Sequence, residues 1–343
     1  MTVYSARLGN IEDAQLRAVT RKANLGAFVS ASPVSGGLFG QNVFVTTTSG
    51  DYVFRGAPHW HNGAPNDAWQ FPKERLYADL LHAHTRAPVA WPQHLDDSCK
   101  HFPWPYVIAP RLSGVCLSAP TDRATLSDQD GIEIANALGR TLADLQSLRR
   151  DRAGDFDPDL QAIAPYPGGY SQHLRTEIEQ QAAAARINQA FGPQDDSWLD
   201  ALFAAEAAHP AETSPVTFAH NDYHLGNVLL EQKQTDWRVS GVIDLMTCNF
   251  GDPAADLVRQ SCDWLDRAPQ CTDAYLLAYR QAGGCAAPTP ARLALLVVYE
   301  RLLIWSYFTR PDVAHAAFKS QTFRSWAEPY SQKLSKLWFD GTR

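Results

Sequence analysis

The chain has 343 residues, of which 45% are hydrophobic and 20% are charged, and its net charge at pH 7 is −7. This composition is typical of a globular protein, and the negative charge argues against nucleic acid as the main partner. The sequence has no run of 18 apolar residues, no secretion signal and no CxxC pair among its six cysteines, so we expect a cytoplasmic protein with reduced thiols and neither a membrane span nor structural zinc.

The first region, to about residue 110, is predicted to consist of strands and one helix. Residues 43–47 and 52–55 are predicted to be two strands joined by the turn signal Ser-Gly-Asp. After a polar loop, the segment KERLYADLLHAH at 73–84 has leucines at helical spacing. APVAWP at 87–92 and WPYVIAP at 104–110 are predicted to be further short strands with proline boundaries.

The second region is predicted to be mainly helical. Residues 130–150 and 171–191 have helical spacing or alanine-rich composition, two short strands are expected around a turn at 232–236, and helices dominate from residue 253 onward. Residues 111–343 carry 21 Lys and Arg against 29 Asp and Glu, whereas residues 1–110 carry 9 against 8. The second region therefore favours a cationic substrate, or else its acidic residues only keep it in solution.

A polar loop stands directly before a short apolar strand in FAHNDYHLGNVLL, residues 218–230. Asp222 and Asn227 lie five residues apart in this loop, and Asp244 follows seventeen residues after Asn227 in GVIDLM. Mg²⁺ prefers oxygen ligands, which Asn227 and Asp244 can supply from the ends of neighbouring strands. Asp222 would then be left to orient and deprotonate a hydroxyl group, as phosphoryl transfer requires. The competing interpretation is that these polar residues only form turns.

Two segments resemble the aminoglycoside phosphotransferase and choline kinase family, whose members are relatives of the protein kinases. HNDYHLGN is similar to the family's His-x-Asp-x-x-x-x-Asn catalytic loop, and VIDLMTCNFGDPAADL is similar to its next Ile-Asp segment and helix start. The resemblance implies a protein-kinase-like α+β fold. A small antiparallel β-rich nucleotide-binding lobe, residues 1–110, would precede a large, mainly helical catalytic and substrate-binding lobe, residues 111–343.

The same resemblance implies a role for each residue of the two segments. Asp222 is expected to be the catalytic base, and Asn227 and Asp244 are expected to bind Mg²⁺, while His220 and His224 order the loop. The cofactors implied are ATP and Mg²⁺.

The start of the helix at GDPAADL also has a physical interpretation of its own. Asp252 suits an N-cap and Pro253 the first helical position. Asp256, one turn further on, is expected to accept hydrogen bonds from the backbone of the catalytic loop.

In the first region the resemblance implies a nucleotide-binding turn at residues 35–40, which contains Gly36 and Gly37. Glycine lets backbone N–H groups approach phosphates closely, although this segment also fits a plain turn. Arg55 occupies the position expected for the phosphate-binding cation, and Glu74 is its candidate partner, unless Glu74 is simply a solvated residue in the first turn of its helix.

The segment IAPRLSG is expected to join the lobes. If Gly114 aligns with the family's glycine, the Pro110 carbonyl would accept from the adenine amino group and the Leu112 N–H would donate to the ring.

The phosphate acceptor is expected to bind on the large lobe, and the sequence leaves its identity open. Asp263, Asp266 and Glu300 could meet ammonium groups, while Trp264, Tyr299 and Trp305 could pack against a sugar or a cation; the alternative is that the aromatics are core and the acids solvated. We expect a small-molecule kinase that acts on an aminoglycoside as an antibiotic resistance enzyme, or alternatively on a choline-like, amino-alcohol, sugar or macrolide acceptor.

A second hypothesis is a nucleotide-binding pseudokinase that acts through partners. The three residues Asp222, Asn227 and Asp244 argue against it, and Arg55 in place of lysine is one of its few supports. The choice between ATP and GTP stays open, and a monomer is the default expectation.

Overall fold

The computed structural model describes residues 2–34, 41–57, 69–118, 123, 126–208, 215–234, 236–313, 315, 318 and 321–340. The chain forms two compact units. The first comprises Met1–Val115, Asp157–Ala162 and Ser240–Met246, and the second comprises Cys116–Phe156, Ile163–Val239 and Thr247–Arg343. Within the described part of the chain, no helix is long and apolar enough to cross a membrane.

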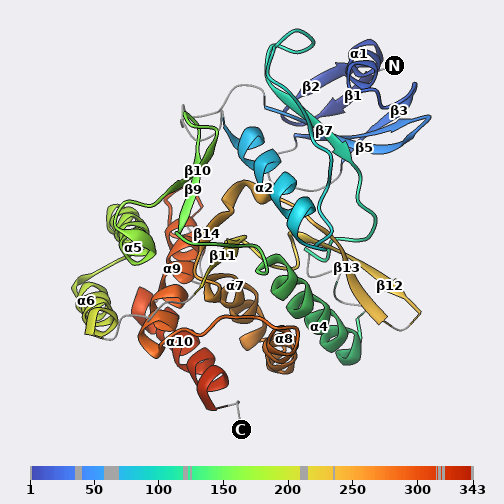
Figure 1. The fold of residues 1–343 in the computed structure, drawn as a ribbon. Helices are drawn as coiled ribbons and strands as arrows, with labels where there is room; N and C mark the ends of the chain where they lie inside the picture. Colours follow the sequence, from blue (N-terminus) through green and yellow to red (C-terminus); the bar gives the residue numbers. More distant parts are fainter. Residues whose placement is uncertain are drawn as a thin grey trace. The chain divides into compact units, whose positions relative to one another are not determined.

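The first unit is built on a five-stranded antiparallel sheet, shown in blue and cyan in Figure 1, with the order β3-β4-β5-β7-β6. Its elements are β1 (Thr2–Ser5), β2 (Gly9–Glu12), α1 (Asp13–Lys22), β3 (Phe28–Pro33), β4 (Asn42–Thr47), β5 (Gly50–Gly56), α2 (Gln70–His84), β6 (His94–Asp96) and β7 (Tyr106–Pro110). The predicted strands at 43–47 and 52–55 and the predicted helix at 73–84 are present as β4, β5 and α2. The unit thus has the expected β-rich character.

Two expectations for this unit were wrong. The first region holds a second helix, α1, whose start is stabilised by a capping box between Glu12 and Gln15. Residues 87–92 do not form a strand, because only Val89 makes a bridge, to Val242. The apolar and proline pattern was correct for an extended segment, but a strand also needs a partner along its length.

Both faces of the five-stranded sheet are covered. Phe54 and Ile108 belong to a cluster with Leu16 of α1 and Trp104. Val107, next to Ile108, belongs instead to a cluster with Phe71 of α2. Neighbouring residues of a strand point to opposite faces, so α1 and α2 cover different sides of the sheet.

The second unit is mainly helical. Its elements, some of which extend into the short segments of the first unit, are α4 (Asp128–Leu145), β8 (Arg149–Arg150), β9 (Gly154–Asp157), β10 (Ala162–Pro165), α5 (Gly169–Ile187), α6 (Pro193–Ala208), β11 (Val216–Ala219), β12 (Val228–Lys233), β13 (Asp236–Val242), η2 (Leu245–Thr247), β14 (Asn249–Gly251), α7 (Ala254–Leu265), α8 (Pro269–Gln281), α9 (Pro290–Phe308) and α10 (Phe323–Asp340). The predicted helices at 130–150 and 171–191 are present as α4 and α5, and the predicted strand pair is β12 and β13. The α+β class is confirmed.

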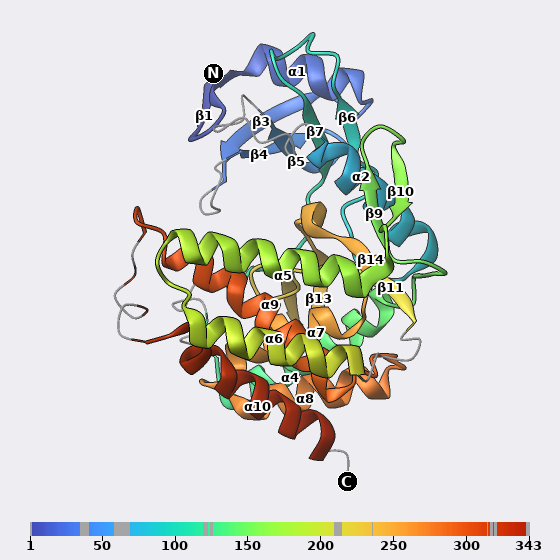
Figure 2. The same ribbon diagram turned by 90° about the vertical axis from the view of Figure 1, so that its left-hand side faces the viewer.

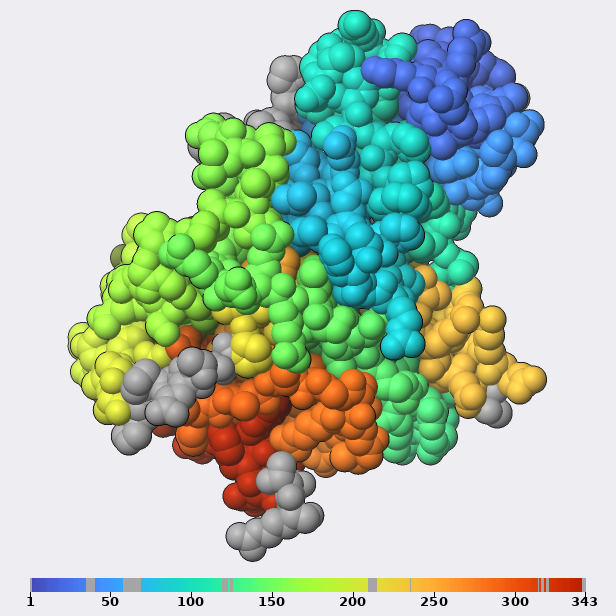
Figure 3. Space-filling view, viewed as in Figure 1, coloured from blue at the N-terminus to red at the C-terminus, as the bar shows by residue number. Residues whose placement is uncertain are grey.

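The helices of this unit pack in groups around α9 and along α4. Helices α5 and α6 lie side by side and both contact α9 (Figure 1, Figure 2). Helix α4 lies against α8, and their surfaces adjoin in the space-filling view (Figure 3). Gly139 makes this approach close, since a Cβ there would lie 2.4 Å from the Tyr275 carbonyl oxygen.

Candidate active site

The predicted catalytic loop, residues 220–227, joins two strands of the second unit. It begins after β11 and ends where β12 starts. Phe218 and Ala219 before the loop, and Val228 and Leu230 after it, are buried. The apolar residues on each side therefore hold both ends of the polar loop in the protein interior, as expected.

Asp256 fixes the backbone at the start of this loop. Its side chain is fully buried on the first turn of α7, where Oδ2 accepts from the His220 N–H at 2.8 Å and Oδ1 accepts from the Asn221 N–H at 2.6 Å. Asp252 Oδ1 accepts from the N–H of Ala254, the first residue of the same helix, at 2.9 Å. Burial raises the pKa of Asp256, and its contacts with His220 partly oppose that rise. The prediction for Asp256 is confirmed, whereas the helix begins one residue later than predicted, with Pro253 in place of Asp252 at the N-cap.

A second set of hydrogen bonds ties the loop to the segment before β14. Thr247 Oγ1 donates to the His220 carbonyl oxygen at 2.8 Å, and Asn221 Nδ2 donates to the Thr247 carbonyl oxygen at 2.8 Å. Asn221 has a φ of 62°, a left-handed conformation that asparagine adopts more readily than most residues. These bonds hold the residue directly before Asp222 in one conformation.

The Asp222 carboxylate has a different neighbour on each side. Its Oδ2 accepts from Asn227 Nδ2 at 2.8 Å, while its Oδ1 lies 3.4 Å from His224 Nε2 and 3.2 Å from Arg259 Nε. Burial alone would raise the pKa of Asp222, but the contact with His224 and the charge of Arg259 outweigh it and hold the pKa below its usual range. The side chain is 35% exposed. An ionised and accessible carboxylate is what a general base requires.

The backbone determines which tautomer of His224 is present. The Gly226 N–H donates to His224 Nδ1 at 3.0 Å, so Nδ1 carries no proton. In the neutral ring the proton then lies on Nε2, which faces Asp222 Oδ1. A Cβ at Gly226 would lie 2.5 Å from the His224 ring, which explains the glycine at this position. The geometry agrees with a role for His224 in ordering the loop and its carboxylate.

Asn227, a predicted Mg²⁺ ligand, uses its amide nitrogen within the loop. Its Nδ2 donates both to the Asp222 carbonyl oxygen at 2.9 Å and to Asp222 Oδ2 at 2.8 Å, so both amide hydrogens are used. Asp244, the other predicted Mg²⁺ ligand, comes after the end of β13 and belongs to the first unit. Its φ is 63°. Aspartate, like asparagine, adopts this left-handed conformation more readily than most residues. An amide oxygen and a carboxylate are hard donors of the kind that Mg²⁺ prefers, so the donor type of each residue fits that ion.

Arg55 and Glu74 form an ion pair in the first unit. Arg55 Nη1, on β5, contacts Glu74 Oε2, on α2, and Gln70 Nε2 donates to the other Glu74 oxygen at 2.7 Å. Burial alone would lower the pKa of Arg55, but the charges of Glu74 and Asp244 raise it. Glu74 is buried, so the alternative of a solvated first-turn glutamate is wrong.

The structure describes only some of the remaining residues that are predicted to bind the nucleotide. Gly36 and Gly37 lie outside the described residues. Pro110 is the last residue of β7, opposite Tyr52 of β5, and the next residue, Arg111, donates its N–H to the Asp51 carbonyl oxygen at 2.9 Å. The backbone before Leu112 is thus tied to the sheet.

Two of the three predicted acceptor carboxylates are engaged by the protein itself. Glu300 is buried and is contacted by Arg259 Nη1 at 2.6 Å and by Arg301 Nε. Asp266 accepts from the Tyr330 hydroxyl at 2.5 Å and from Lys333 Nζ at 3.0 Å. Asp263 is half-buried. The carboxylates of Glu300 and Asp266 therefore already have cationic or hydroxyl partners.

Sequence reasoning missed Arg259, the residue that joins Asp222 to Glu300. A signal was present, because Arg259 follows Asp256 by three residues and so lies on the same face of α7. Trp264 and Trp305, predicted as acceptor contacts or core, are both buried.

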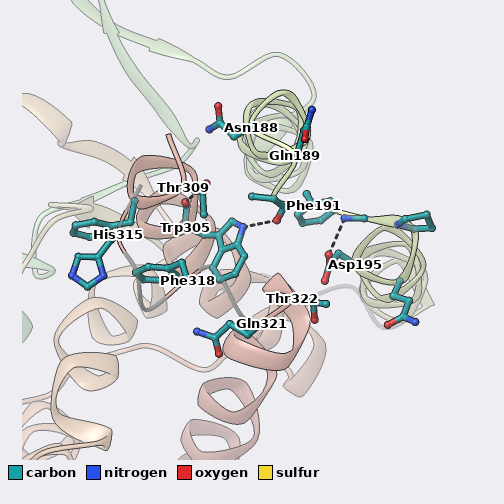
Figure 4. Close-up of a pocket in the computed structure, with 15 residues that line it drawn as sticks. Asn188, Gln189, Phe191, Asp195, Trp305, Thr309, His315, Phe318, Gln321 and Thr322 are labelled. Atoms are coloured by element: carbon teal, nitrogen blue, oxygen red, sulfur yellow. Dashed lines mark hydrogen bonds between the residues drawn. The ribbon is translucent and has the colours of Figure 1, made fainter. Parts of the chain in front are cut away.

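A pocket of about 910 Å³ lies elsewhere in the second unit (Figure 4). It is lined by the turn between α5 and α6, the start of α6, the end of α9 and the segment before α10, with Trp305 and Phe318 among its aromatic residues. Trp305 Nε1 donates to the Ala190 carbonyl oxygen at 2.6 Å, and Asp195 accepts from the N–H groups of Gly192 at 2.9 Å and Arg324 at 2.8 Å. These polar groups hold the segments together.

Comparison with known proteins supports the interpretation of the two motifs. A model of the phosphotransferase enzyme family matches residues 30–296. No curated protein matches the sequence.

Solved structures share the fold at low sequence identity. A Ralstonia eutropha protein provisionally named an aminoglycoside phosphotransferase is 18% identical, with a TM-score of 0.64 and coverage of 95% of this chain and 97% of its own. APH(2″)-IIIa, solved with GDP and kanamycin, is 15% identical (TM-score 0.58, coverage 95% and 99%). A macrolide 2′-phosphotransferase from Brachybacterium faecium is 18% identical (TM-score 0.57, coverage 94% and 97%). The chain therefore belongs to the phosphotransferase enzyme family and has its protein-kinase-like fold.

Proposed function

We propose that this protein is an ATP- and Mg²⁺-dependent kinase that transfers the γ-phosphoryl group to a hydroxyl of a small molecule. The observation that carries the proposal is the environment of Asp222. Its carboxylate is ionised, partly exposed and held by Asn227, on a loop whose backbone is fixed by Asp256. Family membership supports the same conclusion.

Asp222 acts as the general base in this proposal. It orients the acceptor hydroxyl and takes its proton as the acceptor oxygen bonds to the γ-phosphorus and the bond from that phosphorus to the β,γ-bridging oxygen breaks. The products are a phosphate ester and ADP, and the proton remains on Asp222 until it passes to solvent. Because most of the acceleration in phosphoryl transfer comes from positioning and charge, a fixed base is of more use than a strongly basic one.

The other predicted residues serve the nucleotide. The amide oxygen of Asn227 and the carboxylate of Asp244 would bind Mg²⁺, which neutralises charge on the phosphates. Arg55, held by Glu74, would bind phosphate oxygens through its planar guanidinium. Gly36 and Gly37 would offer backbone N–H groups to the phosphates, and Pro110 and Leu112 would bind the adenine.

An aminoglycoside is the first acceptor to test. The excess of acidic residues in 111–343 favours a polycation, and the half-buried Asp263 is the better candidate to meet an ammonium group. Glu300 and Asp266 are poorer candidates, since arginine, lysine and tyrosine already contact them. Choline-like, amino-alcohol, sugar and macrolide acceptors stay as alternatives within the same activity. A non-catalytic pseudokinase is disfavoured by the ordered environment of Asp222.

A panel of acceptors tests the proposal. The purified protein is incubated with ATP and Mg²⁺ and with kanamycin, hygromycin B, a macrolide, choline or a sugar, and ADP release and product mass are measured. Phosphorylation of an aminoglycoside would support the first choice, and phosphorylation of another acceptor alone would move the protein to the metabolite or macrolide kinases. If ATP binds but no acceptor is phosphorylated and no ATP is hydrolysed, the pseudokinase alternative is correct.

A further inference from the structure

Arg259 is an arginine of the second unit that contacts the proposed base. It lies on α7, and two of its nitrogens face two different carboxylates. Nε forms an ion pair with Asp222 Oδ1 at 3.2 Å without a hydrogen bond, and Nη1 donates a hydrogen bond to Glu300 Oε1 at 2.6 Å. The guanidinium is planar and rigid, so the position of one carboxylate constrains the other.

Glu300 is itself fixed from the opposite side. Its second oxygen contacts Arg301 Nε, and the Arg301 guanidinium lies 4.7 Å from the ring centroid of Tyr330 and 5.2 Å from that of Trp326. The side chains become more buried along this row, from 24% exposed for Arg259 to 9% for Glu300 and 4% for Arg301. The row therefore runs from the partly exposed base into the helical core formed with α10.

A carboxylate needs such a contact to keep one orientation. The last torsion of an aspartate side chain is broad, so a single hydrogen bond leaves the group free to turn. Asn227 holds only Oδ2 of Asp222, and His224 stands at the longer distance of 3.4 Å from Oδ1. Arg259 supplies the closer contact on the Oδ1 side.

We propose that Arg259 is a positioning residue for Asp222, and that Glu300 acts through Arg259 to hold the base in its reactive orientation. The inference rests on the proposed kinase activity. Glu300 then supports the base and does not contact the acceptor. Lysine cannot take over the role fully, since a single ammonium group cannot reproduce two contacts made by different nitrogens of one plane.

The test compares Arg259→Ala and Arg259→Lys with the wild-type protein. The rate is that of transfer from ATP to the acceptor found in the panel, or of ATP hydrolysis if water is the only acceptor used. We expect Arg259→Ala to lower kcat about 10- to 100-fold, because a misplaced catalytic group costs about that much, with the KM for ATP little changed. The kcat of Arg259→Lys should lie between those of the wild type and Arg259→Ala. Addition of millimolar guanidinium should restore part of the kcat of Arg259→Ala and should leave the kcat of the wild type unchanged.

Arg280→Ala is the matched control. Arg280 is a partly buried arginine of the same unit that donates to the Trp338 carbonyl oxygen at 3.1 Å and packs on the Trp338 ring. This variant should lose some thermal stability but keep its kcat, and guanidinium should have no effect. Glu300→Gln should lower kcat alone but add little in the Arg259→Ala background, because the two residues act on one path.

The outcomes separate this inference from the proposed function. An active wild-type enzyme whose Arg259→Ala variant keeps full kcat would overturn the inference alone. The inference would also be overturned if the loss of kcat in Arg259→Ala were explained by its lower melting temperature and guanidinium did not restore kcat. A wild-type protein that neither transfers phosphate nor hydrolyses ATP would remove the proposed function, and the inference with it.

Discussion

Asp256 offers a quantitative test of how the catalytic loop is held. Replacing it by alanine leaves two backbone donors, the N–H groups of His220 and Asn221, without their acceptor. An unsatisfied buried donor costs about 1–3 kcal/mol. The His220 N–H is buried, the Asn221 N–H is partly buried, and removal of a buried carboxylate returns some free energy. We therefore expect Asp256→Ala to lower the free energy of unfolding by about 2–4 kcal/mol.

The activity of Asp256→Ala should fall by more than its loss of stability explains. The loop backbone next to Asp222 loses its support, so kcat measured where the variant is still folded should drop more than about tenfold. Urea unfolding followed by tryptophan fluorescence gives the stability, and initial rates with ATP and the acceptor give kcat. Asp195→Ala is the control, because Asp195 is equally buried and accepts from two backbone N–H groups remote from the loop. It should lose similar stability and keep kcat. A loss below about 1 kcal/mol with unchanged kcat for Asp256→Ala would refute the reasoning.

Two further predictions concern the packing and the charges of each unit. Gly139→Ala should lower the free energy of unfolding by about 1–3 kcal/mol, because its Cβ would lie 2.4 Å from a backbone oxygen of α8. Gly131→Ala, which meets only Cys271 Sγ at 3.2 Å, should change stability little in the same denaturation experiment, and equal losses would contradict the account. Burial alone would raise the pKa of Asp96, but hydrogen bonds from Lys22, Ser98 and Tyr106 lower it below its usual range. The stability lost in Asp96→Asn should therefore be greatest above about pH 4 and shrink as the pH falls through the lowered pKa, whereas a pH-independent loss would contradict this.

The sequence predicted the parts of the site that depend on short spacings. Asp222 and Asn227 are five residues apart in one loop, so their contact needs only the loop itself. Asp256 was predicted as a backbone acceptor because a helix start signal, Asp252-Pro253, places it on the first turn of α7. The pairing of Arg55 with Glu74 followed from the resemblance and is present in the structure. The roles of these residues in catalysis stay predictions.

What the sequence did not predict depends on how distant helices cross. Glu300 resembles any acidic residue of an exposed helix face until α9 is packed on α7, where it meets Arg259, and its neighbour Arg301 is fixed by α10. The prediction of a strand at 87–92 was wrong for the same reason, because a strand forms only where a second segment pairs with it. Local pattern indicates the type of an element, whereas the partner of a charge or a strand is set by tertiary packing.

The most direct test of the central claim is the rate of γ-phosphoryl transfer by Asp222→Asn. The amide keeps the size of the side chain and can still contact Asn227, but it cannot accept a proton. We expect the variant to bind ATP with Mg²⁺ as the wild type does and to lose at least about 100-fold in kcat. Full activity in the variant, or the absence of nucleotide binding in both proteins, would contradict the account.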